Sequence, residues 1–493
     1  MWLRRLHVRN LKRLRDFTLD LARPDGTTRM WTMLIGRNGT GKTSLLQAAA
    51  LAAAGSSDAN ELCNRDLREA FLDKRLEKPK RSPGRQPKSP RGPTGPRVEI
   101  GADFFFGPRG RHAEAEHPFL SRRDDVTLRS DDDRRGMWLR SRIYIPSDRA
   151  IEGGADYVEE NAGTLCTPTE GSDGDKTLKF EPPRTRDNDP LVDAREDEAR
   201  KHWFVAAYGV HRDLPETAMV VPRSARPSTD RLRPLFGTHQ LVGPNFATLL
   251  GSKLSPVYVK LLRDVLLHTD RLVPGITKVE LRSRGFISKT EHLTESHRFE
   301  QTVGGTTLKL PARWLSHGYQ SSLAWLADLV GQVVLTAHGR VEPNEMEGLV
   351  LIDEIDLYLH PSWQVGLIEA LRDTFPRMQF ICTTHSPILL SAFHRDEVVM
   401  LDFDDEGNVV QVPTPRDPRL LTGSELYEAF FGIDRLYPAE LGKRLERYVR
   451  IATDPNRTAE EDQRARDLRD SLLEEDIDPG VPLTEQTRPS RAG

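Results

Sequence analysis

The sequence has few cysteines and no long apolar run. Its 493 residues include only Cys63, Cys166 and Cys382, which are odd in number and far apart. Such usage excludes a disulfide framework or a zinc cluster and fits a reducing compartment, so we expect a cytoplasmic protein. No apolar stretch approaches the ~20 residues of a membrane span. The first residues, MWLRRLHVRN, lack the apolar core of a signal peptide. We therefore expect no membrane partner.

The chain also has almost no net charge, but the charge is unevenly distributed. The formal total is −3. Residues 74–97 hold nine Lys or Arg and one Glu among many Pro and Gly, which predicts a flexible basic loop. This loop is either a solvated insertion or a contact for DNA or RNA. Residues 151–200 are acidic and poor in apolar residues, which predicts a second, partly disordered insertion.

Hydrophobic periodicity predicts an α/β fold with a mixed, mostly parallel sheet flanked by helices. Buried strands alternate with helical segments, and this order is typical of parallel sheets. Strands are expected over residues 2–9, 17–21, 31–35, 98–106, 140–145, 203–208, 348–353 and 378–384. Helices are expected over residues 43–54, where Gly55 can end the helix, over 254–268 and after Pro361. A hairpin is expected near 276–310, with turns at Arg284–Gly285 and Gly304–Gly305.

A phosphate-binding loop follows the third strand. GRNGTGKT, residues 36–43, matches GxxxxGK[ST] between a predicted buried strand and a predicted helix, which is the context that the motif needs. Its glycines let backbone amides surround a phosphate, Lys42 reaches the β and γ oxygens of ATP, and the Thr43 hydroxyl can ligate Mg²⁺. The nucleotide-binding residues predicted here are Gly36, Asn38, Gly39, Gly41, Lys42, Thr43 and Ser44.

Two acids end a later apolar strand, LVLIDE over residues 349–354. A carboxylate at the end of a buried strand is costly unless it has a task. Next to a phosphate loop, Asp353 is placed to hold Mg²⁺ and Glu354 to polarise the attacking water. One helix-and-strand unit later, TTHSP places His385 at another strand end, where it could sense the γ-phosphate by a hydrogen bond.

A second anion site is predicted at residues 314–322, WLSHGYQSS. Ser316 can cap a helix there, and Gly318 leaves the first turn bare. A helix N-terminus with a hydroxyl and free amides binds anions. The sequence alone does not identify the phosphate that this site would contact.

Taken in order, GRNGTGKT, LSHGYQ, LIDEID and TTHS resemble the Walker A, signature, Walker B and switch-histidine motifs of ABC-type ATPases. The N-terminal LHVRNLKRLRDFTLDL and the His-Pro pair in LHPSWQ, residues 359–364, are similar to the SMC/RecF/OLD branch. The resemblance covers residues 1–55 and 310–400 well and the middle poorly. It departs from LSGGQ at His317 and Tyr319, whose side chains could change partner specificity.

This resemblance implies an ATP-dependent homodimer or higher oligomer. In the family, the signature helix contacts the γ-phosphate of ATP bound to the other protomer. Ser316, Gly318 and Gln320 would therefore act in trans, with Asp356 at the same seam. The Q-loop glutamine of the family is not identifiable here.

The resemblance also suggests what the ATPase controls. There is no sustained heptad repeat for an SMC coiled coil, and no HNH-type Cys/His cluster. Asp402, Asp404, Asp405 and Glu406 look like a strand and turn rather than a nuclease centre. The compact head resembles stand-alone ATPases of prokaryotic anti-phage systems such as Septu, retron and PARIS systems. We therefore expect a separate effector, with an HNH-type nuclease as one candidate. The alternatives are a RecF-like DNA-repair ATPase, a self-contained nuclease and, least supported, a transporter-coupled subunit.

The expected domain organisation is a split ATPase head and a helical tail. The head is predicted over residues 1–415 and the tail over 416–493. In the tail, a helical stripe precedes the capping box of Thr458 and Glu461, which starts a further helix. This tail either packs on its own domain or docks a partner. Residues 477–493 are expected to be disordered.

Overall fold

The structure, a computed structural model, forms two compact units, Met1–Leu421 and Thr422–Gly493. It describes residues 1–23, 27–63, 65–72, 97–106, 137–146, 150–158, 191, 203–214, 227–237, 241–267, 276–280, 298–337, 345–433, 439–475 and 477–483. The predicted basic loop lies outside these residues apart from Arg97, as does most of the predicted acidic insertion. None of the described helices is long and apolar enough to cross a membrane.

A six-stranded sheet in the order β14-β13-β3-β12-β11-β7 carries the predicted motifs. Its strands are β3 (Trp31–Gly36), β7 (Val205–Tyr208), β11 (Gly348–Ile352), β12 (Met378–Thr383), β13 (Val398–Phe403) and β14 (Val409–Val412). All pairings are parallel except that of β13 with β14. Every residue of β7, β11 and β12 is buried, as expected for strands covered on both faces. The α/β prediction is confirmed.

The second sheet of this unit is antiparallel, in the order β2-β1-β4-β5-β6. Its strands are β1 (Trp2–Leu11), β2 (Leu14–Asp20), β4 (Arg97–Phe106), β5 (Met137–Pro146) and β6 (Glu152–Val158). Buried and more exposed residues roughly alternate along β1, so one face of this sheet packs inward while the other carries polar side chains.

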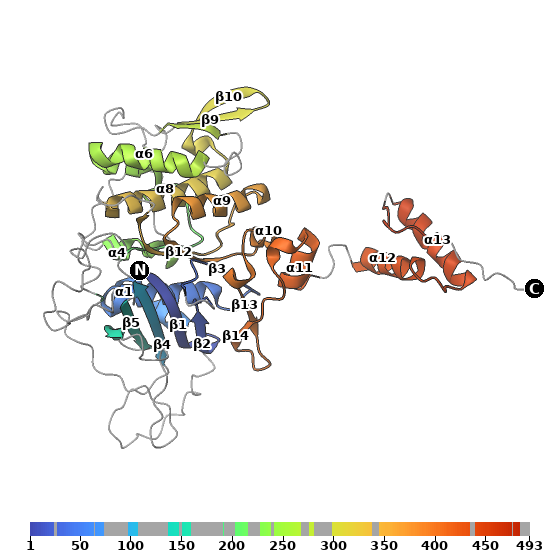
Figure 1. Cartoon of the computed structure of the whole chain (residues 1–493), viewed down its shortest axis with the longest axis horizontal. Coiled ribbons are helices and arrows are strands. Elements are labelled where there is room, and N and C mark those ends of the chain that lie inside the picture. Colours follow the sequence, from blue (N-terminus) through green and yellow to red (C-terminus); the bar gives the residue numbers. More distant parts are fainter. Residues whose placement is uncertain are drawn as a thin grey trace, which may run out of the picture. The chain divides into compact units, whose positions relative to one another are not determined.

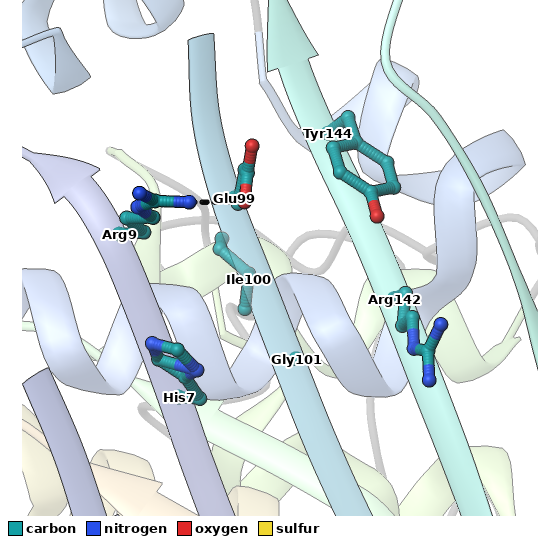
Figure 2. Close-up of a pocket in the computed structure, with 7 residues that line it drawn as sticks. All are labelled: His7, Arg9, Glu99, Ile100, Gly101, Arg142 and Tyr144. Carbon is teal, nitrogen blue, oxygen red and sulfur yellow. Dashed lines mark ion pairs between the residues drawn. The ribbon is translucent and has the colours of Figure 1, made fainter. Parts of the chain in front are cut away.

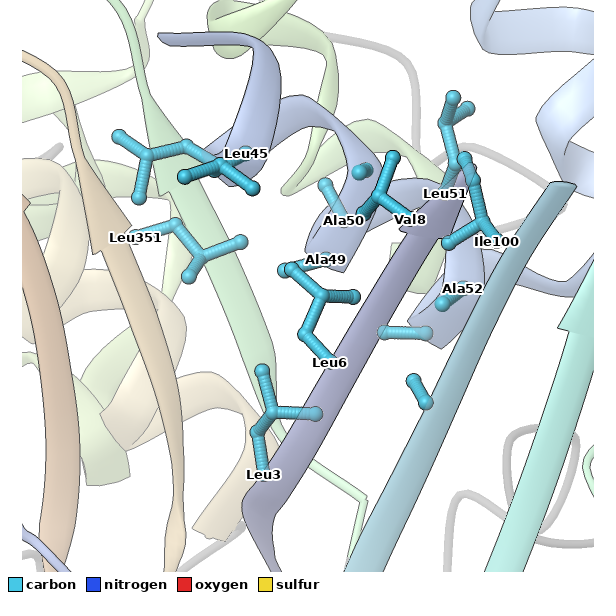
Figure 3. Packing of buried hydrophobic residues seen from close by; sticks show 14 of the residues in the cluster. Leu3, Leu6, Val8, Leu45, Ala49, Ala50, Leu51, Ala52, Ile100 and Leu351 are labelled. Atoms are coloured by element: carbon cyan, nitrogen blue, oxygen red, sulfur yellow. The ribbon is translucent and has the colours of Figure 1, made fainter. Parts of the chain in front are cut away.

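Helix α1 (Lys42–Leu62) fills the space between the two sheets. Leu6, Val8 and Ile100 pack against its alanines from one side, and Leu351 packs from the other (Figure 3). Small alanine side chains allow both sheets to approach the helix closely. Gly55, with φ 73 and ψ 167, is not helical and ends the first helical stretch, as the sequence predicted, and a second stretch follows this kink and extends α1 to Leu62.

A helical layer covers the opposite face of the six-stranded sheet (Figure 1). It consists of α6 (Gly251–Leu267), α8 (His317–Ala337) and α9 (Pro361–Thr374). A three-stranded antiparallel sheet, β10-β9-β8, adjoins it. Its strands are β8 (Ile276–Glu280), β9 (Arg298–Val303) and β10 (Thr306–Pro311). The turn predicted at Gly304–Gly305 joins β9 and β10, whereas Arg284–Gly285 lies outside the described residues.

Short helical elements connect these layers. The α-helices among them are α2 (Arg65–Phe71), α4 (Pro227–Asp230), α5 (Phe246–Leu249) and α10 (Pro387–Leu390). The 3₁₀ turns are η5 (Arg233–Leu235), η6 (Gly243–Asn245), η8 (Ala312–Trp314), η10 (Arg395–Glu397) and η11 (Pro418–Leu420). Asp402 lies in strand β13, and the acidic stretch after this strand forms a turn. In that turn, the Asp404 carboxylate accepts a hydrogen bond from the backbone N–H of Asn408 at 2.7 Å. This is the strand and turn that the sequence predicted.

The unit Thr422–Gly493 contains α11 (Gly423–Phe431), α12 (Ala439–Ala452) and α13 (Ala459–Leu473). The predicted capping box at Thr458 and Glu461 is present. The core between α12 and α13 consists of Tyr448, Ile451, Ala452, Ala465 and Leu472.

The expectation of disorder from residue 477 onward is wrong for the first part of that segment. Ile477, Val481 and Leu483 pack against the core of α12 and α13. The Tyr448 hydroxyl donates to the Val481 carbonyl at 2.7 Å. These apolar residues, spaced along a Pro- and Gly-containing stretch, contribute packing without forming a helix. The residues after 483 lie outside the described part of the chain.

Candidate active site

The backbone of the loop between β3 and α1 favours glycine at three positions, Gly36, Gly39 and Gly41, all of which have positive φ. Gly41 is in the left-handed region, with φ 81 and ψ 17. A Cβ at Gly36 would lie 2.4 Å from the Leu401 carbonyl oxygen, closer than atoms can pack. Asn38 and Gly39 form the exposed turn of the loop.

The Lys42 side chain folds back into this loop. Its Nζ donates to the carbonyl oxygens of Gly36 at 2.7 Å and Arg37 at 3.2 Å. The side chain is only 7% exposed, and this burial lowers the pKa of Lys42, although the Asp353 and Glu354 carboxylates oppose the shift. A phosphate in the loop would give the ammonium a full counter-charge in place of two carbonyl dipoles.

Two predicted metal ligands meet although they lie 310 residues apart in sequence: the Thr43 hydroxyl donates to Asp353 Oδ2 at 2.8 Å. The Thr383 hydroxyl donates to Asp353 Oδ1 at 2.7 Å, so both carboxylate oxygens of this buried group are hydrogen-bonded, as its burial requires. Ser44 faces elsewhere, because its hydroxyl accepts from Lys12 Nζ at 2.8 Å.

Glu354 follows in a left-handed backbone conformation with φ 48. Its N–H donates to Thr383 Oγ1 at 2.7 Å, so one threonine holds both acids of the motif. Its side chain is half-buried. The carboxylate of Asp356 accepts from Thr384 Oγ1 at 2.6 Å.

His385 lies at the same edge of the sheet. Strand β12, which it follows, runs between β3 and β11, so the sheet order places His385 between the phosphate loop and the acidic pair. Its side chain is exposed.

The second predicted anion site is at the start of α8. Ser316 is exposed and immediately precedes the helix. Gly318 lies so close to the chain after the acidic pair that an added Cβ would be 2.3 Å from the Tyr358 carbonyl oxygen. Gln320 Nε2 donates to the Leu315 carbonyl at 2.7 Å. The structure thus places the start of α8 beside residue 358.

The two departures from the LSGGQ pattern make aromatic contacts. His317 stacks on Tyr358, with ring centroids 4.6 Å apart, and Tyr319 stacks on Trp363 at 4.5 Å. The aromatic surface continues at Trp314, which is 74% exposed. These stacks tie the start of α8 to the segment after the acidic pair.

Sequence reasoning missed Thr383 and Arg212. Arg212 follows β7 and is 2% exposed. Its guanidinium Nη2 donates to the Asp353 and Glu354 carbonyl oxygens, the second at 2.9 Å. The only sequence signal is a single arginine after a predicted strand, which has no specific meaning by itself.

A separate hollow lies on the polar face of the five-stranded sheet (Figure 2). It forms over Gly101, which has no side chain to fill the space. Its lining residues are His7, Arg9, Glu99, Ile100, Gly101, Arg142 and Tyr144. None of these residues belongs to the predicted site.

The oxygen atoms of Thr43 and Asp353 fit Mg²⁺. This ion prefers hard oxygen ligands and commonly takes one or two from the protein, with water and substrate phosphates completing its shell. A hydroxyl and a carboxylate 2.8 Å apart match that requirement. Within the described ranges, no group of three or more His, Cys, Asp or Glu is placed to hold a metal.

Comparison with protein families agrees with this geometry. Residues 249–391 match the family described as "AAA domain, putative AbiEii toxin, Type IV TA system". The match includes the start of α8, the acidic pair and His385, but not the phosphate loop. Over these residues the chain is similar to that family.

The curated relatives include a Septu protein and a retron protein that is named a probable ATPase. "Septu protein PtuA" of Bacillus mycoides is 31% identical over 159 residues, which are 32% of this chain and 22% of the relative. "Retron Ec83 probable ATPase" of Escherichia coli is 31% identical over 235 residues, 44% of this chain and 42% of the relative. The chain is homologous to both, and it spans less than half the length of each.

Solved structures are similar only in outline. An SMC head bound to the C-terminal winged-helix domain of ScpA has a TM-score of 0.43 at 13% identity, with 84% of this chain and 98% of that chain covered. The SMC head domain of Thermotoga maritima has a TM-score of 0.36 at 13% identity, with 84% and 100% covered. Such scores assign no residue and no role.

Proposed function

We propose that this chain binds and hydrolyses ATP as a nucleotide-controlled switch, and that the switch regulates a separate effector in a prokaryotic anti-phage defence system. The observation that carries the ATPase part is the hydrogen bond of 2.8 Å between Thr43 and Asp353. It joins the phosphate loop to the acidic pair, and that pairing of parts is what phosphoryl transfer requires.

In this proposal, the loop from Gly36 to Thr43 surrounds the phosphates with backbone amides, and the Lys42 ammonium moves from its two carbonyl partners to the β and γ oxygens. Thr43 and Asp353 hold Mg²⁺, which neutralises phosphate charge when it is bound. Because hydroxyl and carboxylate already lie within hydrogen-bond distance, little rearrangement is needed for them to share one ion.

Glu354 is the proposed general base. Its backbone N–H is fixed by Thr383, which also holds Asp353, so the two acids keep a set relative position. A half-buried carboxylate at a sheet edge is accessible to water and can orient a water molecule for attack. His385 is proposed to contact the γ-phosphate and to report whether it is present.

The start of α8 is proposed to complete the site of a second copy of this chain. Ser316 is exposed and immediately precedes α8, and the N-terminus of a helix favours an anion. ATP would favour closure of the dimer, because the contacts between the start of α8 and the γ-phosphate exist only when the partner has bound ATP. Asp356 and Gln320 would lie at the same seam.

The names of the relatives support a role in defence. A Septu protein and a retron probable ATPase are similar to this chain over part of its length. The effector that the switch regulates is proposed to be a separate nuclease, of HNH type or another. The unit Thr422–Gly493 is proposed to dock this partner.

The first experiment is to purify the tagged chain with the products of its neighbouring genes and to assay the eluate for ATP hydrolysis and nuclease activity, with and without ATP. A co-purifying nuclease whose activity depends on nucleotide is the expected result. An ATPase that acts alone and is stimulated by DNA in a salt-sensitive manner would instead support the RecF-like DNA-repair alternative.

Three variants test the site itself. Lys42→Ala should abolish ATP binding. Glu354→Gln should bind ATP and accumulate a closed dimer because hydrolysis is slow; turnover at the wild-type rate would refute the assignment of the base. Ser316→Arg should leave ATP binding intact but prevent ATP-driven dimerisation, and unchanged dimerisation would exclude a role in trans.

A further inference from the structure

Arg212 is a buried arginine whose hydrogen bonds all run to main-chain carbonyls around the acidic pair. Its Nε donates to the Gly209 carbonyl at 2.6 Å. Its Nη2 donates to the carbonyls of Asp353 and Glu354. The side chain is 2% exposed. It therefore links the end of β7 to the two residues that follow β11.

Burying a guanidinium in this way is costly. Burial lowers the pKa of Arg212 to about 10, against the attraction of the Asp353, Asp356 and Glu354 carboxylates. An apolar side chain would fill the same volume without a desolvation cost. The specific gain from arginine is a rigid fork of donors that can hold more than one carbonyl.

The carbonyls that it holds flank a strained residue. Glu354 has φ 48, a conformation that a residue with a Cβ adopts at a cost of roughly 1–3 kcal/mol unless its surroundings enforce it. Arg212 fixes the carbonyls on both sides of that φ angle, and Thr383 fixes the Glu354 N–H. Rotation of the Glu354 backbone would break these bonds together.

The same guanidinium contacts the signature helix. It lies 5.9 Å from the ring centroid of Trp325 in α8, and Trp325 also packs at 5.9 Å from the ring of Tyr208 in β7. The Tyr208 hydroxyl donates to Asp328 of α8 at 3.1 Å. A shift of α8 would therefore change the position of the Arg212 guanidinium, and through it the backbone of Glu354.

We propose that Arg212 is a positioning residue for ATP hydrolysis: it holds the Glu354 backbone in its strained conformation and couples that conformation to the signature helix. This rests on the proposed ATPase function. The chain is expected to bind ATP through the loop from Gly36 to Thr43 without Arg212, but to hydrolyse it poorly.

The experiment compares Arg212→Met and Arg212→Lys with Arg231→Met. Arg231 is a matched control because it is 8% exposed, donates to the Val205 carbonyl at 3.1 Å and lies 5.0 Å from the Phe204 ring, at the other end of β7. Affinity for a fluorescent ATP analogue, kcat at saturating ATP and the urea midpoint are measured for each full-length variant.

Arg212→Met should lower kcat about 10²-fold, as loss of precise positioning does, while the affinity for the analogue changes less than about threefold. Arg212→Lys should recover part of this loss because an ammonium can still hold one carbonyl. Arg231→Met should lose similar stability but keep its kcat. Equal effects of the two methionine substitutions on kcat would overturn the proposal.

A double variant identifies the route of the effect. If Arg212 acts through Glu354, Arg212→Met should produce no further loss of kcat when combined with Glu354→Gln. Additive losses would mean that Arg212 acts otherwise. A wild-type chain without ATPase activity would refute the proposed function itself, whereas an active wild type with additive losses would refute only the role of Arg212.

Discussion

Replacement of Thr383 by valine gives the sharpest test of how the acidic pair is held. Valine has the same shape as threonine, but it removes the hydroxyl that donates to Asp353 Oδ1 at 2.7 Å and accepts from the Glu354 N–H at 2.7 Å. Thr383 is 0% exposed, so water cannot easily replace either bond.

The cost follows from these two bonds. A hydrogen bond to a charged group contributes about 1.5–3 kcal/mol and a neutral one about 0.5–1.5 kcal/mol. Their loss should reduce the free energy of unfolding by about 2–4 kcal/mol. If the proposed function is right, ATP hydrolysis should slow as well, because the backbone of Glu354 loses its N–H anchor, while ATP binding persists.

Thr32→Val is the matched control. Thr32 lies on the neighbouring strand β3, in register with Ile381, and is also 0% exposed. Its hydroxyl has no hydrogen-bond partner within the described part of the chain, so valine should be neutral or should stabilise by about 1 kcal/mol.

Urea denaturation followed by tryptophan fluorescence measures both changes. A Thr383→Val variant that loses no more stability than Thr32→Val would refute the account of how the acidic pair is held. The comparison does not depend on the protein's activity.

Three further predictions concern stability. Gly331→Ala places a Cβ 2.1 Å from the Phe246 ring and should destabilise by about 1–3 kcal/mol, whereas Gly237→Ala, with nothing within 4 Å, should be neutral in the same melting assay. Burial raises the pKa of Asp328 above its ordinary 3.8, so its protonated form is favoured in the folded state. In urea titrations at a series of pH values, the free energy of unfolding of the wild type should therefore fall relative to that of Asp328→Asn as the pH rises above about 4. A difference between the two free energies that does not change with pH would contradict this. Tyr448→Phe removes a hydrogen bond of 2.7 Å to the segment after α13 and should increase proteolysis there at a cost of about 1 kcal/mol.

Several elements were predictable because their signals are local. The strands β3, β11 and β12 are mostly apolar with no regular alternation of polar residues, and this pattern indicates burial on both faces. The loop of residues 36–43 is recognisable from its glycine spacing, because its backbone angles favour glycine. The capping box at Thr458 is likewise a contact between residues only three positions apart.

The sequence prediction was incomplete where packing outweighs local preference. A second helical stretch follows the kink at Gly55 and extends α1 to Leu62, which the sequence did not predict. Residues 477–483 are ordered because a few apolar side chains find a core that α12 and α13 build elsewhere in the chain. Neither outcome is visible in a window of neighbouring residues.

The sequence by itself determined which groups are available for phosphate chemistry: the glycine loop, Lys42, Thr43 and the acids that end β11. Only the tertiary structure decided how those groups are held, because their partners lie far away along the chain. Thr383 reaches Asp353 from a different strand, and Arg212 reaches it from across 141 residues. A buried carboxylate or a strained backbone must be satisfied by some donor, but many residues could supply one, and the fold selects those that arrive at the right place.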